Sequence, residues 1–267
     1  MKLSIFEEYP TEENFAKLDL LPFPVFLYIA APSLTKWKNI RDQVSSHEAV
    51  ADVGYWPILT EREGYWLSPF SQERALERVM NELEECKEEL TVLWDAEPPL
   101  LRPSLFFRGL PGFVRKSRRI RKFLANAKSH GLSIVSCEYA STGSIIDWLY
   151  RCFTVSFNGG DGIINKMVMC YTSFPLISAL RKRILWQISR QQESLGADYS
   201  VALGTIAQGV FGTEPILSPT DLAKDITDLR DLGVHNFALF RLGGLDEEYA
   251  AVLKEHLASA ADLSAKA

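Results

Sequence analysis

Residues 90–99 read Leu-Thr-Val-Leu-Trp-Asp-Ala-Glu-Pro-Pro, a short apolar run followed by two carboxylates and two prolines. Residues i and i+2 of a strand point to the same face, so Asp95 and Glu97 project side by side, about 7 Å apart along the backbone. Two carboxylates at this separation perturb each other's protonation. If the strand belongs to a barrel, the pair lies at the end of the barrel where barrel enzymes carry their active sites.

Similar apolar runs recur along the chain and alternate with helical patterns. Eight strand-like segments start 22 to 42 residues apart, near the ~30 residues that a strand–helix unit needs. They are 3–6, 25–30, 51–55, 90–94, 132–137, 166–171, 200–204 and 237–242. Between them, 71–89 has an amphipathic helical pattern, and another helix starts at Ser218-Pro219 and ends before Gly233. This alternation predicts a single (β/α)8 barrel over residues 1–267.

The barrel prediction has two further parts and one rival. We expect a lengthened connection between the fourth strand and the fourth helix, and fraying over residues 258–267. The rival fold is an open doubly wound sheet. That fold calls for a glycine-rich phosphate turn after an early strand, and the sequence has no such turn.

Composition narrows the function classes. The 267 residues carry a net charge of −5, which gives no general attraction to nucleic acid. The four cysteines are scattered without a CxxC spacing, as expected for reduced thiols rather than disulfides or a zinc site. The sequence shows neither the apolar core of a signal peptide nor an apolar run long enough to span a bilayer. We therefore expect a soluble protein that is cytoplasmic, or exported with its signal already removed. Its oligomeric state is not indicated.

The residue types at the predicted strand ends point to carbohydrate chemistry. Histidine and lysine are missing there, which disfavours Ser-His-Asp hydrolysis, His-ligated zinc, a His general base and Schiff-base chemistry. Carboxylates and aromatic side chains remain, and this combination suits proton transfer at glycosidic oxygens and stacking on sugars. We expect the following residues to bind substrate: Glu8, Tyr28, Tyr55, Trp56, Trp94, Glu138, Tyr139 and Arg241.

Two short motifs carry a family resemblance. Asp95-Ala-Glu97 after the fourth strand and Met169-Cys-Tyr171 after the sixth resemble the corresponding motifs of glycoside hydrolase family 18, the chitinases and their relatives. The resemblance implies that Glu97 is the general acid and that Asp95 orients a substrate 2-acetamido group, which acts as the nucleophile. It also implies that Tyr171 donates a hydrogen bond to that group, with no metal or cofactor.

The chain departs from the family pattern at several positions. Leu90 and Leu93 stand where the family has two further aspartates, and Thr172 follows the tyrosine where an acidic or amide residue is common. The third strand ends Asp52-Val-Gly-Tyr55 instead of Ser-x-Gly-Gly. Near Phe240, no tryptophan stands at the eighth strand.

Two other function classes remain open. Glu7 or Glu8, together with Asp95, Glu97 and Glu138, would form an oxygen cage for magnesium in a lyase, isomerase or phosphoester hydrolase. Because Glu7 and Glu8 are adjacent, at most one of them lines a site. The second alternative is a barrel that binds a ligand without catalysis. Arg241 would either bind a substrate anion or pair with Glu7 or Glu8.

The segment 102–128 combines basic and aromatic residues in a pattern that reads as an extended loop and a basic amphipathic helix. We expect its apolar face, with Phe106 and Phe107, to pack on the barrel and its charges to be solvated. The alternative, which we do not favour, is that exposed phenylalanines and cations form a patch for an anionic membrane surface.

Overall fold

The computed structural model describes residues 1–21, 23–99, 103–157, 163–210 and 212–264. In these ranges, eight strands form one closed sheet in the order β1 to β8, and the pairs β1–β2, β3–β4, β4–β5, β7–β8 and β8–β1 are parallel. The strands are β1 (Lys2–Glu7), β2 (Val25–Ala31), β3 (Val50–Pro57), β4 (Leu90–Asp95), β5 (Leu132–Tyr139), β6 (Ile163–Met169), β7 (Tyr199–Gly204) and β8 (Asn236–Phe240). The predicted (β/α)8 barrel is confirmed.

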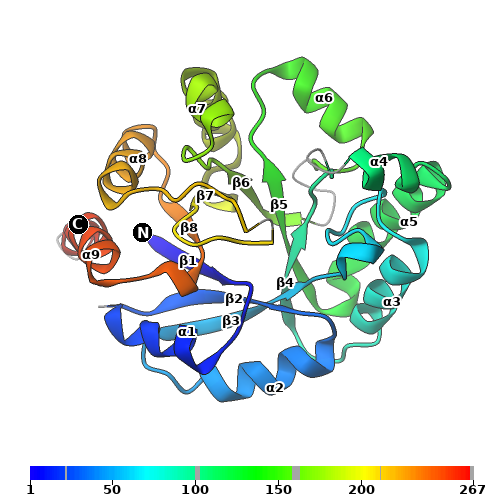
Figure 1. Cartoon of the computed structure of the whole chain (residues 1–267), viewed down its shortest axis with the longest axis horizontal. Helices are drawn as coiled ribbons and strands as arrows, with labels where there is room; N and C mark the ends of the chain where they lie inside the picture. The colour runs from blue at the N-terminus through cyan, green and yellow to red at the C-terminus, as the bar shows by residue number, and fades with distance from the viewer. Residues whose placement is uncertain (22, 100–102, 158–162, 211, 265–267) are drawn as a thin grey trace. The chain divides into compact units, whose positions relative to one another are not determined.

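Helices alternate with the strands, and short 3-10 turns extend several of them (Figure 1). The α-helices are α1 (Glu12–Ala16), α2 (Leu34–Val44), α3 (Glu73–Glu84), α4 (Pro103–Gly109), α5 (Phe113–Asn126), α6 (Ser144–Cys152), α7 (Pro175–Leu195), α8 (Pro219–Asp231) and α9 (Glu247–Ser264). The 3-10 turns are Lys17–Leu20, Glu61–Glu63, Ala127–His130, Gly196–Asp198 and Leu242–Gly244. The connection after β4 holds two helices, α4 and α5, which confirms that it is lengthened.

Contacts between Cα atoms group the chain into two compact units. The first unit comprises Met1–Ile29, Ile40–Val53 and Val168–Ala267; the second comprises Ala30–Asn39 and Gly54–Met167. In the first unit, β1 pairs with both β2 and β8, and α8 packs against α9. In the second unit, β4 pairs along its whole length with β5, from Leu90↔Leu132 to Asp95↔Cys137.

Local sequence signals explain several element boundaries. The Ser218 side chain accepts a hydrogen bond from the Asp221 backbone N–H at 3.1 Å and caps α8, with Pro219 as the first helical residue, as predicted. Strand β6 begins three residues earlier and ends two residues earlier than expected. Tyr171 therefore lies two residues beyond its end. Helix α9 ends at Ser264, and 265–267 lie outside the described residues, so fraying over residues 258–267 stays a prediction.

The basic segment packs partly as expected. Helix α5 buries its apolar face through Ile120, Phe123 and Leu124, and Phe106 stacks on Phe70 with ring centroids 4.6 Å apart. Phe107, in contrast, is 67% exposed. The part of the segment expected to be extended loop contains the short helix α4, whereas Arg102 lies outside the described residues. The segment is thus a connecting helix that also carries an exposed apolar end.

Candidate functional site

The two faces of the β3–β4–β5 sheet differ in what covers them. Tyr55 packs on Trp37 of α2 with ring centroids 5.6 Å apart, and Trp94 packs on Phe123 of α5 at 5.4 Å. Both side chains therefore lie on the helix-covered face. Asp95 follows Trp94 and points to the opposite face, which is the interior face of a parallel barrel. The geometry separates Tyr55 and Trp94 from the carboxylates that we expected them to accompany.

Asp95 is held at the end of β4 by two hydrogen bonds. The Trp56 indole Nε1–H donates to Asp95 Oδ2 at 3.2 Å, and Asp95 is only 4% exposed. The Leu67 backbone N–H donates to the Asp95 carbonyl at 3.0 Å, which ties the loop after β3 to this strand end. Trp56 therefore lies beside Asp95, and an indole N–H bond to a buried carboxylate fixes the orientation of both groups.

Glu97 meets Tyr139 at the neighbouring strand end. The Tyr139 hydroxyl donates to Glu97 Oε2 at 2.7 Å. Burial, the negative charge of Glu97 and the hydrogen bond to it raise the pKa of the Tyr139 phenol well above its ordinary value. Cys137, paired in register with Asp95, is buried, and burial followed by the charges of Asp95, Glu97 and Glu138 raises the pKa of its thiol well above its ordinary value. Burial is the largest cause of both shifts, and the charges of Asp95 and Glu97 add to each of them.

Glu138 belongs to a buried ion pair instead of the carboxylate pair. It shares a face with Ser136, which is in register with the helix-facing Trp94. Its carboxylate lies 2.9 Å from Lys166 Nζ, and it accepts hydrogen bonds from Ser136 Oγ at 2.7 Å and the Phe157 N–H at 3.1 Å. These contacts are all made within the protein and hold Glu138 in place. They give no support to the substrate-binding role predicted for Glu138.

In the first unit, an aromatic row crosses three neighbouring strands. Phe6 is in register with Tyr28 and with Phe240, and its ring centroid lies 5.7 Å and 6.1 Å from theirs. Tyr171 continues the row, with its centroid 6.0 Å from that of Phe240. Because Phe6, Tyr28 and Phe240 are in register, their side chains share one face of the sheet, and Tyr171 contacts that face through Phe240. Next to Tyr171, burial followed by the charge of Asp225 on α8 raises the pKa of the Cys170 thiol to about 12.

A second carboxylate lies close to Glu8, and the sequence analysis did not select it. Glu8 Oε2 and Glu214 Oε1 lie 3.0 Å and 3.1 Å from the position that a Cβ would take on Gly209. The two oxygens are therefore within about 6 Å of each other, and both residues are nearly buried. Glu214 is the first carboxylate after β7, which was the available signal. The tight approach requires glycine at position 209.

Glu7 and Arg241 form a structural pair on the other side of β1. Arg241 Nη1 lies 3.4 Å from Glu7 Oε1, and the Arg241 guanidinium also donates to the Gln208 carbonyl at 3.0 Å and 2.8 Å. Glu7 further accepts hydrogen bonds from the Tyr9 and Gly243 N–H groups. Of the two roles considered for Arg241, the structure shows the pairing with Glu7.

The two histidines that precede strands lie at strand amino ends. His130 lies two residues before Leu132, where β5 begins in the second unit, and seven residues before Cys137, the partner of Asp95 in the register. The His235 carbonyl accepts a hydrogen bond from the Lys2 N–H at the start of β1 in the first unit. In each unit, histidine is thus at the strand end away from the acidic and aromatic groups, as expected.

The predicted magnesium cage does not assemble from its members in the second unit, because Glu138 and Asp95 lie on opposite faces of the sheet. Over the ranges that the structure describes, no group of three or more His, Cys, Asp or Glu side chains is arranged to hold a metal ion. Within the same ranges, no helix is both long and apolar enough to cross a membrane. We derive no chemical step through a metal.

Comparisons with known proteins show the fold. No family model and no curated protein matches the sequence. The glycoside hydrolase domain of PgaB (BpsB) from Bordetella bronchiseptica is 11% identical, with a TM-score of 0.57 and coverage of 96% of this chain and 98% of that one. A chitinase of glycoside hydrolase family 18 from Pseudoalteromonas aurantia is 11% identical, with a TM-score of 0.57 and coverage of 96% of this chain and 100% of that one. A D-tagatose 3-epimerase-like protein is 13% identical, with a TM-score of 0.54 and coverage of 99% of this chain and 100% of that one. At such identities, the likeness extends to the barrel architecture alone.

Proposed function

We propose that this protein is a carbohydrate-active hydrolase that cleaves a glycosidic bond through Glu97, with Asp95 beside it. The observation that carries the proposal is the strand-end pair itself: Asp95 held by Trp56, and Glu97 held by Tyr139, on the face away from the helices. Aromatic side chains beside carboxylates form the kind of surface that binds sugars and transfers protons to them. The glycoside hydrolases among the similar folds support this class of substrate.

Glu97 would act as the proton donor to the leaving oxygen. Its hydrogen bond from Tyr139 holds the carboxyl group in one orientation, which proton transfer to a bound substrate requires. As the bond to the leaving oxygen breaks, the carbonyl oxygen of the substrate's 2-acetamido group attacks the anomeric carbon. A water molecule then opens the resulting ring, and Glu97 takes up the proton of that water, so the enzyme returns to its starting state.

Asp95 would hold the acetamido group for that attack. A carboxylate beside the amide N–H orients the group and stabilises the positive charge that develops on it. The Trp56 indole keeps Asp95 in place and offers an aromatic wall. The family resemblance implies that Tyr171 donates a hydrogen bond to the same acetamido group. Tyr171 belongs to the first unit, and this role stays a prediction from sequence. The proposed route uses no metal or other cofactor.

The proposal is tested by incubating the full chain with β-linked N-acetylglucosamine oligosaccharides and measuring new reducing ends. We expect cleavage that persists in EDTA, and a loss of at least ~10²-fold in turnover for Glu97→Gln with little change in substrate binding. Glu89→Gln provides the matched control, because Glu89 is an exposed carboxylate outside the site.

The rival functions give different results in the same assay. Activity abolished by EDTA and restored by magnesium would favour the metal-dependent enzyme. Binding of the oligosaccharide without any cleavage would favour a ligand-binding barrel. Wild-type turnover in the Glu97→Gln variant would remove Glu97 from the mechanism.

A further inference from the structure

The junction between α4 and α5 exposes large apolar side chains. Phe107 is 67% exposed, Leu110 46% and Val114 60%, whereas such side chains are usually buried in globular proteins. They lie close together along the chain, since the Leu110 N–H donates to the Phe107 carbonyl one turn earlier and α5 begins at Phe113. This cluster is more than the scattered exposed apolar residues that need no explanation.

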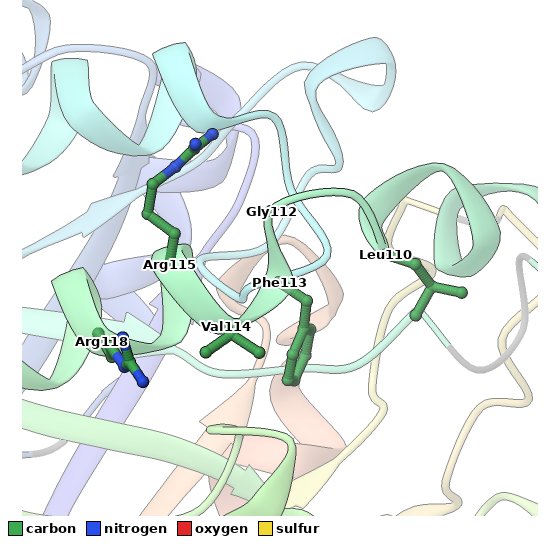
Figure 2. A pocket seen from close by; sticks show the side chains of 6 residues that line it. All are labelled: Leu110, Gly112, Phe113, Val114, Arg115 and Arg118. Carbon is green, nitrogen blue, oxygen red and sulfur yellow. The ribbon is translucent and has the colours of Figure 1, made fainter.

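Leu110 and Val114 line a shallow hollow that is also lined by cations (Figure 2). Its volume is about 570 Å³, and it is lined by Leu110, Gly112, Phe113, Val114, Arg115 and Arg118. Figure 2 shows Phe113 and Val114 pointing to the same side, while Arg115 points the other way, toward α3. Arg115 binds Glu73 of α3 there, so Arg118 is the cation that the hollow presents.

The sequence around this hollow is strongly basic. No aspartate or glutamate occurs between Glu97 and Glu138, a stretch that contains nine lysines and arginines in a chain of net charge −5. Several of these cations are engaged: Arg115 with Glu73, Arg119 with Glu84, and Lys116 with two backbone carbonyls. Arg118 and Lys122 are exposed, and neither has an acidic partner among the described residues.

The unengaged cations share one stripe of α5 with Val114, the member of the apolar cluster that lies on this helix. Val114, Arg118 and Lys122 are spaced i, i+4 and i+8 on α5, so they follow one another along a single face. Ile120, Phe123 and Leu124, on another face, are buried against the sheet. Helix α5 therefore packs inward and still presents an outer stripe that is apolar at its amino end and cationic beyond it.

We propose that this outer stripe, together with Phe107 and Leu110, docks the protein on an anionic lipid bilayer. An apolar end beside unpaired cations matches the boundary between acyl chains and negatively charged headgroups. A hydrophilic polyanion such as nucleic acid would satisfy Arg118 and Lys122, but it would leave Leu110 and Val114 in water. The exposed aliphatic side chains therefore favour the bilayer over a soluble polyanion.

Co-sedimentation of the full chain with vesicles tests the proposal. The probes are vesicles of phosphatidylcholine alone and of equal parts phosphatidylcholine and phosphatidylglycerol, at low and high salt. We expect salt-sensitive binding to the anionic vesicles. Arg118→Gln and Lys122→Gln should each lower the partition coefficient about fivefold, the factor that corresponds to roughly 1 kcal/mol per basic residue near an anionic membrane. Phe107→Ser should lower it by about tenfold or more through lost apolar burial.

Matched controls come from exposed positions elsewhere. Lys224→Gln on α8 removes an exposed cation, and Leu176→Ser on α7 removes a side chain that is 68% exposed. Neither should change binding. The proposal is overturned if anionic vesicles are not bound, if Phe107→Ser binds them as well as wild type does, or if a DNA duplex is bound while vesicles are not. Circular dichroism of each variant establishes that it is folded before its binding is compared.

Discussion

Replacing Lys166 with methionine should destabilise the protein strongly, because Lys166 is the ion-pair partner of the buried Glu138. The side chain of Lys166 is 12% exposed and that of Glu138 is 1% exposed, and their charged atoms are 2.9 Å apart. Methionine has a similar length and no charge, so the change removes the cation and little volume. The Glu138 carboxylate would keep its hydrogen bonds from Ser136 and Phe157 but lose its counter-charge.

The magnitude follows from the burial of the two partners. Removing one member of a fully buried ion pair costs about 3–5 kcal/mol, because a charge is left without compensation. Since part of Lys166 reaches solvent, we expect the lower end of that range, about 3 kcal/mol.

Urea unfolding of wild type, Lys166→Met and the double variant Lys166→Met/Glu138→Gln gives the three free energies of unfolding. The double variant should lose less than the single variant, because a neutral amide needs no cation. Lys128→Met, at an exposed position, is the matched control. A loss within about 0.5 kcal/mol for Lys166→Met, as at ordinary surface positions, would refute the structural role assigned to the pair.

Burial also raises the pKa of Glu7 above its ordinary 4.5, against hydrogen bonds and the charge of Arg241 that lower it. Protonated Glu7 therefore stabilises the fold fully below about pH 4.5, and this stabilisation is lost as pH rises through the raised pKa. Over that pH range, the free energy of unfolding of wild type should fall relative to that of Glu7→Gln in urea titrations. A pH-independent difference would contradict this. Phe123→Ala should cost about 3–5 kcal/mol because it opens a cavity under Trp94, whereas the same change at exposed Phe107 should cost less than about 0.5 kcal/mol in the same assay. Equal losses at the two positions would show that α5 is not packed as described.

The barrel was predictable because its signal is repeated. Strand-like runs, a capped helix start at Ser218 and glycine after helix ends recur at the spacing of strand–helix units, so an error in one unit does not change the fold. Strand β6 shows such an error. Lys166 was taken as the beginning of the strand, although β6 already starts at the β-branched Ile163.

The faces of the strands were harder to predict. Both faces of a parallel barrel strand are apolar, so alternation does not reveal which face meets the helices. The i, i+2 spacing correctly keeps Ser136 with Glu138, but only the register Trp94↔Ser136 and the contact of Trp94 with Phe123 show that this set faces the helical layer. Sequence alone therefore did not show that Glu138 and Asp95 point to opposite faces of the sheet.

The proximity of Glu8 and Glu214 was not predictable for a different reason. It depends on how the chain after β7 passes over Gly209, and that conformation is not encoded in a local pattern. Arg241 illustrates the opposite case. Arg241 follows β8, which pairs with β1, so the acidic residues at the end of β1 were its expected ion-pair partners. Pairing with Glu7 was one of the two roles considered from sequence, and the structure shows it.

The proposed role of Glu97 as the group that protonates the leaving oxygen is tested most directly by how the rate loss depends on the leaving group. The rate loss caused by Glu97→Gln is measured on an N-acetylglucosamine oligosaccharide, whose leaving alkoxide needs a proton, and on the dinitrophenyl glycoside, whose leaving phenolate needs none. We predict a loss of ~10²-fold or more on the oligosaccharide and a much smaller loss on the aryl glycoside. Equal losses on the two substrates would contradict the assignment of Glu97 as the general acid.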